Sequence, residues 1–394
     1  MPIYLDHAAT TPLRREVLDA MLPYLTEAFG NPSSAHAYGR RARGALDEAH
    51  ELVAKGIGAE AREIVFTSGG TEALNLGLKG AAWAGKARGH RIVTSAVEHH
   101  AVGHTLRYLE KFGFEVVELP VDRYGRVDPD QVEAALTDRT ILVAVMLANN
   151  EVGTIQPIAE IGRRVHARRG ILFAVDAVQA APYLEIDVEL LGADLLTMSA
   201  HKFEGPKGVG ALYLRHGTHI VVQQQGGEQE RHRRGGTENV AGAVGMAAAF
   251  ELACAERAPT AIRLGQLRDR LQRAILEVDG TELTGHPDER LPGLLSLITR
   301  DADGTSITVG LDLEGIASSV GSACTSGSTE VSHVLTAMGY PEEEARGALR
   351  LSLGRSTTDA DIDQAASIIP RVVAALRTGH VAVAADPLGQ GIPA

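Results

Sequence analysis

The sequence predicts an α/β protein in which helices cover both faces of a mainly parallel sheet. Short apolar runs alternate with segments of helical periodicity from about Glu63 to Leu214. Runs that are apolar throughout are typical of strands buried on both faces of a parallel sheet. Polar and glycine-rich motifs follow several of these runs, at the carboxyl ends of the strands, where such sheets bind their ligands.

The expected elements begin with two helices. Thr11 and Pro12 provide an N-cap and a first helical position for a helix over Leu13–Phe29. Glycine, asparagine and proline end that helix, and a second one is expected from about Tyr38 to Lys55. The strands expected to form the sheet are Glu63–Thr67, Arg91–Ser95, Glu115–Leu119, Ile141–Met146, Ile171–Asp176, Asp194–Met198 and Val209–Leu214.

The last part of the chain has a different pattern. Helical stretches over Glu238–Glu256 and Ala261–Val278 precede strands near Leu294–Thr299 and Leu349–Leu353, which indicates a smaller α+β domain. The expected division is a large domain over residues 12–257, a small domain formed by residues 1–11 and 258–379, and a flexible tail over residues 380–394.

Composition and charge exclude several classes of protein. The chain has 394 residues, a net charge of −12 and a pI near 5.7, which argues against a surface for nucleic acid or for an anionic membrane. No apolar stretch is long enough to span a bilayer, and the N-terminus has no signal-peptide pattern. The two cysteines, Cys254 and Cys324, cannot form a disulfide framework. We expect both to be free thiols in a reducing cytoplasm.

Ser199-Ala200-His201-Lys202 is the most informative motif in the chain. It follows an expected strand, and Gly205-Pro206-Lys207-Gly208 comes next, so Lys202 is expected on a tight turn between strands. A lysine held there can lose its proton and attack a carbonyl as a neutral amine. Taken alone, the motif is better explained by a solvated surface lysine.

Two further motifs also follow strands. In Phe66-Thr67-Ser68-Gly69-Gly70-Thr71-Glu72-Ala73, glycines connect a strand to a helix, whose free N–H groups and dipole bind phosphate. A glycine turn with a threonine cap explains this stretch equally well. Asp176, at the end of a buried strand, needs a partner such as a protonated pyridine nitrogen, unless it caps a helix.

Histidines follow another strand in Val97-Glu98-His99-His100. An imidazole at this place can stack on an aromatic ring and exchange protons near neutral pH. His100 and His104 are four residues apart, which also suits zinc. No metalloprotease motif or cysteine cluster accompanies them, so we expect no metal site.

Small and polar residues surround the second cysteine in Gly321-Ser322-Ala323-Cys324-Thr325-Ser326-Gly327-Ser328. Free cysteine is usually buried and inert, and Cys254, in an alanine-rich helical stretch, fits that description. Cys324 is expected on a mobile exposed loop instead, which is typical of a nucleophile that moves during a reaction.

Together these motifs predict a pyridoxal 5′-phosphate site. Such a cofactor needs a lysine amine, a phosphate-binding turn and groups that bind and polarise its ring. Lys202 is expected to form the Schiff base, Thr71 and its turn to hold the phosphate, and Asp176 to pair with the ring nitrogen.

With these motifs, the chain resembles the cysteine desulfurases of the NifS/IscS type, which are fold-type-I enzymes of the class-V aminotransferase family. The resemblance extends from Tyr4-Leu5-Asp6-His7-Ala8-Ala9-Thr10, where His7 replaces the usual asparagine, to Leu351-Ser352-Leu353-Gly354-Arg355. It implies an aminotransferase-like large domain with a mainly parallel seven-stranded sheet, and a smaller α+β domain that carries the catalytic cysteine loop. It also implies a homodimer.

The resemblance implies a role for each matching residue. His99 would stack on the ring, Gln179 would face its phenolic oxygen, and Thr237 would reach the phosphate in the partner subunit. Asn150 and Arg355 would bind the carboxylate side of the substrate. The implied catalytic residues are Cys324, Lys202 and His99, and the implied cofactor-binding residues are Gly70, Thr71, His99, Asn150, Asp176, Gln179, Ser199, His201, Lys202 and Thr237.

The implied reaction converts L-cysteine to L-alanine and leaves the sulfur as a persulfide on Cys324. The sulfur would pass to an acceptor or scaffold protein for iron–sulfur cluster assembly or thiolation. No resident metal is implied; a transient contact between Cys324 and a cluster stays open. Three alternatives also stay open: a selenocysteine lyase, another aminotransferase or β-lyase, which would share Lys202 and Asp176 without needing a mobile thiol, and an inactive scaffold protein.

Overall fold

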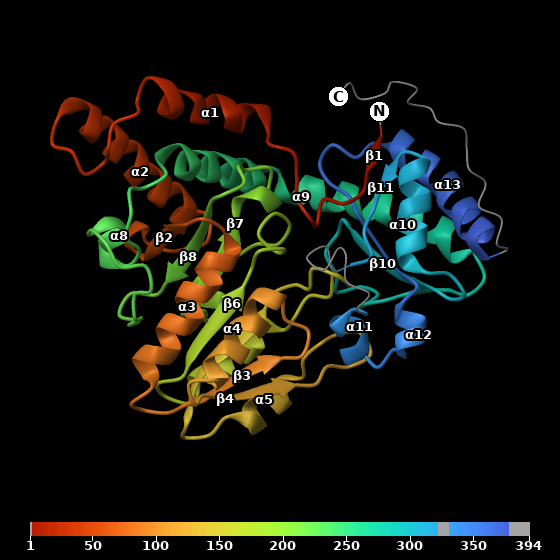
Figure 1. The fold of residues 1–394 in the computed structure, drawn as a ribbon, viewed down its shortest axis with the longest axis horizontal. Helices are drawn as coiled ribbons and strands as arrows, with labels where there is room; N and C mark the ends of the chain where they lie inside the picture. Colours follow the sequence, from red (N-terminus) through yellow and green to blue (C-terminus); the bar gives the residue numbers. More distant parts are fainter. Residues whose placement is uncertain (1, 322–330, 378–394) are drawn as a thin grey trace, which may run out of the picture.

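The computed structural model describes residues 2–321 and 331–377. Cys324 and the expected tail over residues 380–394 lie outside the described residues. Within them the chain forms two β-sheet regions with their own hydrophobic cores, one containing the large sheet and the other the small sheets (Figure 1).

The large sheet has seven strands and is mainly parallel, which confirms the expected fold class. Five neighbouring strands are parallel, and β8 runs antiparallel to the strands on both of its sides. The order across the sheet is β2 (Ile64–Thr67), β8 (Gly210–Leu214), β7 (Leu195–Ser199), β6 (Leu172–Asp176), β5 (Thr140–Met146), β3 (Arg91–Ser95) and β4 (Glu115–Leu119).

Helices cover both faces of this sheet because alternate residues of each strand point to opposite faces. In β2, Val65 packs in a cluster with α3 (Gly70–Gly85) and α4 (His100–Glu110). Its neighbours Ile64 and Phe66 pack in the cluster of the opposite face. The helices that contribute to that cluster include α1 (Arg15–Thr26), α2 (Ala37–Lys55), α5 (Pro129–Ala135), α6 (Ile158–His166), α7 (Val188–Leu191) and the first half of α9 (Val240–Leu276).

A second core forms around two small sheets. β10 (Leu294–Thr299) pairs antiparallel with β12 (Ala348–Ser352) and with β9 (Thr281–Leu283), and β1 (Ile3–Tyr4) pairs with β11 (Ile316–Ala317). The second half of α9, α10 (Gly304–Leu313) and α13 (Asp359–Arg377) pack on these strands. The short helices are η1 (Ala61–Glu63), η2 (Ala200–Lys202), α8 (Gln229–His232), α11 (His333–Ala337) and α12 (Glu342–Ala345).

Two expectations about helices differ from the structure. The expected pair of helices after Gly236 is one helix, α9, which continues through Pro259. Its two halves are each held in a separate hydrophobic core, and this packing outweighs the local cost of the proline. The expected division of the chain at residue 257 falls within α9 and stays a prediction.

Thr11 does not cap the first helix. α1 begins later, at Arg15, and has no side-chain cap. The Thr11 hydroxyl instead donates to the carbonyl of His201 at 2.8 Å and accepts from the N–H of Glu204 at 2.8 Å. The residue therefore ties the N-terminal segment to the turn that carries Lys202. Among the described residues, no helix is both long and apolar enough to cross a membrane.

Candidate active site

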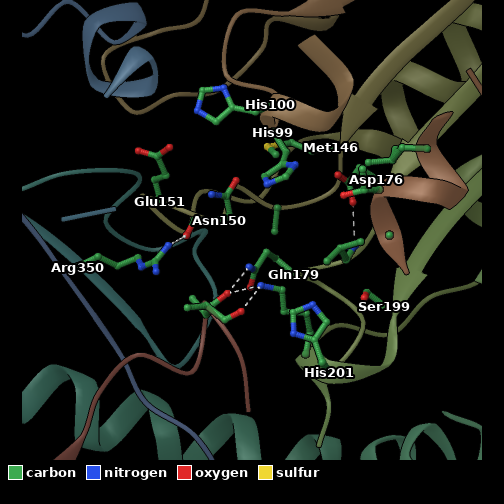
Figure 2. Close-up of a pocket in the computed structure, with 18 of the residues that line it drawn as sticks. His99, His100, Met146, Asn150, Glu151, Asp176, Gln179, Ser199, His201 and Arg350 are labelled. Carbon is green, nitrogen blue, oxygen red and sulfur yellow. Dashed lines mark hydrogen bonds between the residues drawn. The ribbon is translucent and has the colours of Figure 1, made fainter. Parts of the chain in front are cut away.

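A cavity of about 210 Å³ lies at the carboxyl ends of the parallel strands (Figure 2). Different strands supply its lining: residues just after β2, β3, β5, β6 and β7 all face it. The sequence-predicted residues that line this cavity are Gly70, Thr71, His99, Asn150, Asp176, Gln179, Ser199, His201 and Lys202.

Lys202 stands at the end of the short helix η2, directly after β7. Its Nζ donates to the carbonyl oxygen of Ala8 at 2.5 Å and to that of Ala9 at 2.9 Å. Gln179 Nε2 also donates to the carbonyl of Ala8, at 2.9 Å. The N-terminal segment thus holds the lysine at the cavity wall, and the amine has to leave these carbonyls before it can act as a nucleophile.

Asp176 ends β6, is buried and lines the cavity. Burial raises the pKa of this carboxyl to about 6, although the N–H of Val178, 3.0 Å from Oδ1, and the positive charge of Lys202 both lower it. A carboxylate in such a place is stabilised by a cationic N–H group. The charge of Asp176 therefore favours a ligand with a protonated ring nitrogen.

His99 is the N-cap of α4, and its Nδ1 accepts a hydrogen bond from the N–H of Ala101 at 3.1 Å. Burial and the nearby positive charge of Lys202 lower the pKa of His99 to about 4. The imidazole is therefore neutral near pH 7, with its proton on Nε2, because Nδ1 is the acceptor. A neutral ring fixed in this way suits stacking against a flat ligand.

The part of the cavity wall formed by the start of α3 is suited to an anion. Gly69 has a φ of 153°, which glycine adopts more readily than other residues. Helix α3 begins directly after it, and the first N–H groups of a helix have no partner within the helix. A Cβ atom on Gly70 would lie 2.9 Å from Val178 Cγ2, so a side chain there would crowd the cavity. Ser199 and His201 line both this cavity and an adjoining open one of about 400 Å³, to which Lys207 contributes a positive charge.

These observations fit pyridoxal phosphate. An amine, a buried carboxylate, the start of a helix and the hydroxyls of Thr71 and Ser199 all line this cavity. Gly70 leaves the space that a side chain would fill. The sequence motifs predicted the same roles for Lys202, Asp176 and the turn at Thr71.

Three sequence-predicted residues are not part of this set. Arg355 does not line the cavity, and its Nε donates to Glu204 Oε2 at 2.7 Å. Thr237 is exposed on the loop before α9 and does not line the cavity either. Cys324 lies outside the described residues.

Arg350 is the arginine that lines the cavity, and sequence analysis missed it. It belongs to β12, whereas Arg355 comes after Gly354, beyond the end of that strand. Only 2% of Arg350 is exposed, and its Nη1 donates to the carbonyl of Asn150 at 2.9 Å. A charged residue inside an apolar strand was the signal that could have identified it, because a buried charge needs a partner.

Three more residues that sequence analysis did not assign to the cofactor site line the same cavity. Glu151, His100 and His333 line the cavity, and the rings of the two histidines are 4.7 Å apart. Ser332 Oγ donates to Glu151 Oε2 at 2.6 Å, which holds that buried carboxylate at the cavity edge. Within residues 2–321 and 331–377, no group of three or more such side chains is arranged to bind a metal ion.

Comparisons with known proteins identify the family of the chain. Residues 3–365 match the family of class-V aminotransferases. The chain is 50% identical to a protein named cysteine desulfurase IscS from Methanosarcina thermophila, over 95% of this chain and 93% of that one. A relative of the same name from Dictyoglomus turgidum is also 50% identical, over 95% of each chain.

Solved structures give the same result for the fold. A NifS-like protein superposes with a TM-score of 0.90 at 38% identity, covering 95% of this chain and all of the other. The family match and the close relatives each span nearly the whole chain. The chain therefore belongs to the class-V aminotransferase family, within which its curated relatives are named cysteine desulfurases.

Proposed function

We propose that this protein is a pyridoxal-phosphate-dependent cysteine desulfurase that converts L-cysteine to L-alanine and carries the sulfur on Cys324. The observation that carries this proposal is the convergence of Lys202, Asp176 and His99 on one cavity that also contains the buried Arg350. An amino-acid substrate needs these groups together: an amine that exchanges with its own, and a cation for its carboxylate.

Pyridoxal phosphate, when bound, supplies a carbonyl carbon that amines attack and a ring that withdraws electrons. Asp176 is placed to accept a hydrogen bond from the ring nitrogen and to keep the proton there. The N–H groups at the start of α3, with Ser199 and His201, would bind the phosphate. His99 would cover one face of the ring.

Lys202 has two tasks in this proposal. Its amine would hold the cofactor at rest, and its Nζ, when released, would take the proton from the α-carbon of the substrate. Neutral His99 would donate its Nε2 proton to the carbon skeleton when the carbon–sulfur bond breaks.

Arg350, and not Arg355, is proposed to bind the substrate carboxylate. Its guanidinium faces the cavity and is held by Asp6 and by backbone carbonyls, whereas Arg355 is bound to Glu204 outside the cavity. Asn150 keeps the role expected for it, since it lines the cavity next to Arg350.

The role of Cys324 rests on the sequence motif and on the family, since the residue lies outside the described part of the chain. Attack of its thiolate on the sulfur of bound cysteine forms a sulfur–sulfur bond and breaks the carbon–sulfur bond. The carbon skeleton then gains protons and leaves as alanine, while the sulfur stays on Cys324 as a persulfide for the acceptor protein.

A homodimer is part of the proposal, with Thr237 serving the partner subunit. The exposed apolar side chains of Leu18, Leu22 and Leu25 follow one another on α1 at helical spacing, which is the kind of surface that a second copy would cover. Light scattering should give twice the chain mass of 41.7 kDa, and Leu22→Glu should shift the protein toward the monomer. The identity of the sulfur acceptor and the cytoplasmic location stay predictions.

The first experiment measures alanine and sulfide released from L-cysteine, with pyridoxal phosphate and a reductant present. We expect equal amounts of the two products. Cys324→Ala should abolish sulfide release, and Cys254→Ala should not. Cys254 is a matched control because it is half-buried in α9, with Arg257 Nη2 3.1 Å from its sulfur, and burial raises its pKa.

Other products would contradict the proposal. Pyruvate and ammonia in place of alanine would identify a β-lyase, and transfer of the amino group to a keto acid would identify an aminotransferase. A selenocysteine lyase would release selenide from selenocysteine and little sulfide from cysteine under the same conditions.

A further inference from the structure

A second cavity, of about 50 Å³, lies behind Lys202, and this lysine lines both cavities. Many of the side chains that line this rear cavity are charged. Its charged lining residues are Arg14, Lys202, Glu204, Glu256, Arg257 and Arg355. Among the acidic residues of this lining, Glu204 is the one on the same turn as Lys202, two residues further along the chain.

The backbone of Glu204 is held in an unusual conformation. Its φ of 62° lies in the left-handed region, which residues other than glycine seldom adopt. The N–H of Glu204 donates to Thr11 Oγ1 at 2.8 Å, and its carbonyl accepts from the N–H of Arg14 at 3.0 Å. Contacts on both sides of the peptide therefore fix where this carboxylate points, and strained residues of this kind tend to occur at functional sites.

Arg355 is the arginine of this cavity that contacts the carboxylate of Glu204. Arg14 forms two hydrogen bonds with Glu256, at 2.8 and 2.7 Å, and Arg257 donates to Cys254 and to the carbonyl of Ala181. Arg355 Nε lies 2.7 Å from Glu204 Oε2, with 14% of the Glu204 side chain exposed.

We propose that Arg355 is a positioning residue that holds and neutralises the Glu204 carboxylate, so that this negative charge does not favour the protonated form of the Lys202 amine. The inference rests on the proposed function, because it gives Lys202 its role as cofactor-bound amine. A nearby carboxylate without a counter-ion favours a protonated amine, and a protonated amine is neither a nucleophile nor a base. Arg355 would thus act on the reaction from outside the active-site cavity.

Of the charged groups around Lys202, the pair of Glu204 and Arg355 is the one whose net charge a substitution can change without altering the active-site cavity. In the active-site cavity the lysine interacts with His99, Asp176 and His201, whose charges are set by that cavity. Behind it, burial lowers the pKa of His7 and raises the pKa of Tyr183, so both are uncharged near pH 7. Arg14 pairs with both Glu256 and Glu16, and Arg257 donates to Ala181 and Cys254, so neither arginine pairs with the Glu204 carboxylate.

The test follows the visible absorption of the cofactor-loaded protein as a function of pH, without substrate. The midpoint of this titration reports the protonation of the Lys202 nitrogen that is bound to the cofactor. Arg355→Gln should raise the midpoint by about 0.5 pH unit or more, allowing for the exposure of the pair. Arg355→Lys, which keeps the positive charge, should stay near the wild-type midpoint.

Glu204→Gln provides the decisive comparison. In that background Arg355→Gln should have no further effect on the midpoint, because the charge that Arg355 neutralises is gone. Arg300→Gln is the matched control, since Arg300 also pairs with a carboxylate, Glu282, at 3.1 Å but lines neither cavity. An unchanged midpoint in Arg355→Gln, or a shift that persists with Glu204→Gln, would overturn the inference.

Failure of this inference can be distinguished from failure of the proposed function. A loaded protein that releases sulfide but titrates alike in all variants overturns the inference alone. A loaded protein that shows the shift but releases no sulfide overturns the desulfurase reaction and supports the inference. A protein that takes up no pyridoxal phosphate overturns both.

Discussion

Arg350 and Asp6 form an ion pair between strand β12 and the N-terminal segment, with 2.9 Å between Nη2 and Oδ1. The same N-terminal segment accepts the hydrogen bonds of Lys202 through Ala8 and Ala9. The proposed carboxylate-binding arginine and the proposed cofactor-binding lysine are thus attached to one short stretch of chain. We therefore expect a movement of either side chain to shift this segment and, with it, the position of the other side chain.

Replacing Arg350 by lysine should weaken substrate binding. A lysine keeps the positive charge but loses the planar fork that binds a carboxylate with two hydrogen bonds. We expect the KM for L-cysteine to rise about tenfold, with a smaller change in kcat. Steady-state kinetics measure both, and Arg300→Lys, in an exposed pair, serves as the control. An unchanged KM in Arg350→Lys would exclude this residue as the carboxylate ligand.

Replacing Asp176 by asparagine should weaken cofactor binding. The amide has almost the same shape but no negative charge for a protonated ring nitrogen, so affinity for pyridoxal phosphate should fall roughly 10- to 100-fold. Asp194→Asn is a matched control, because Asp194 is also buried in this part of the fold but pairs with Arg215 and lies outside the cavity. A titration that gives both variants equal affinity would contradict the role of Asp176.

Glu98 should make the stability of the protein depend on pH. Burial raises the pKa of this carboxyl to about 8, although Ser95 and the N–H of Met146 donate to it. Between pH 5 and 8 the folded protein holds a proton on Glu98 that the unfolded chain releases, so stability falls as pH rises through this window. Glu98→Gln removes that dependence.

The comparison of Glu98→Gln with wild type isolates this residue, because the other titrating groups are common to both. The variant should gain stability relative to wild type as pH rises from 5 to 8, by on the order of 2 kcal/mol. Urea unfolding at each pH measures the difference. A constant difference across the range would show that Glu98 is ionised in the folded protein.

The buried pair of His50 and Glu230 should contribute strongly to stability. His50 Nε2 lies 2.9 Å from Glu230 Oε2, and the N–H of Phe66 also donates to this carboxylate, at 3.1 Å. Glu230 begins a run of three residues with left-handed backbone conformations. Glu230→Ala should lower the free energy of unfolding by about 3 kcal/mol, since it leaves buried groups without a partner.

A double variant tests whether that loss belongs to the pair. His50→Ala and Glu230→Ala together should cost less than the sum of the single changes, because the second removes a partner that is already lost. Additive effects in urea unfolding would mean that the two side chains act independently.

Much of the fold and of the site was predictable because both depend on local patterns. The apolar run over Arg91–Ser95 is strand β3 with the same bounds, and Asp176 ends its strand as expected. The antiparallel direction of β8 was not predictable, because apolar periodicity carries no information on strand direction. β1 and β11 have two residues each, too short to produce a pattern.

The arginine in the cavity was missed although the pattern contained a signal for it. Arg350 and Arg355 stand close together in one motif, and the resemblance assigned the later one, whereas the expected strand near Leu349–Leu353 contains Arg350 and ends before Arg355. The strand ends at Ser352, so the earlier residue keeps the alternation that directs it into the cavity. The later one follows the turn at Gly354 and meets Glu204 on the far side of Lys202. Position along a strand, rather than residue type, separates the two roles.

The long helix α9 gives the molecule a mechanical property. Its first half packs in the core of the large sheet and its second half packs in the core of the small sheets, so one continuous helix belongs to both cores (Figure 1). Unfolding of either core would remove apolar contacts that hold this helix. We therefore expect residues on both sides of Pro259 to unfold in one thermal transition. A substitution that destabilises the second core should then also lower the temperature at which the active-site cavity is lost.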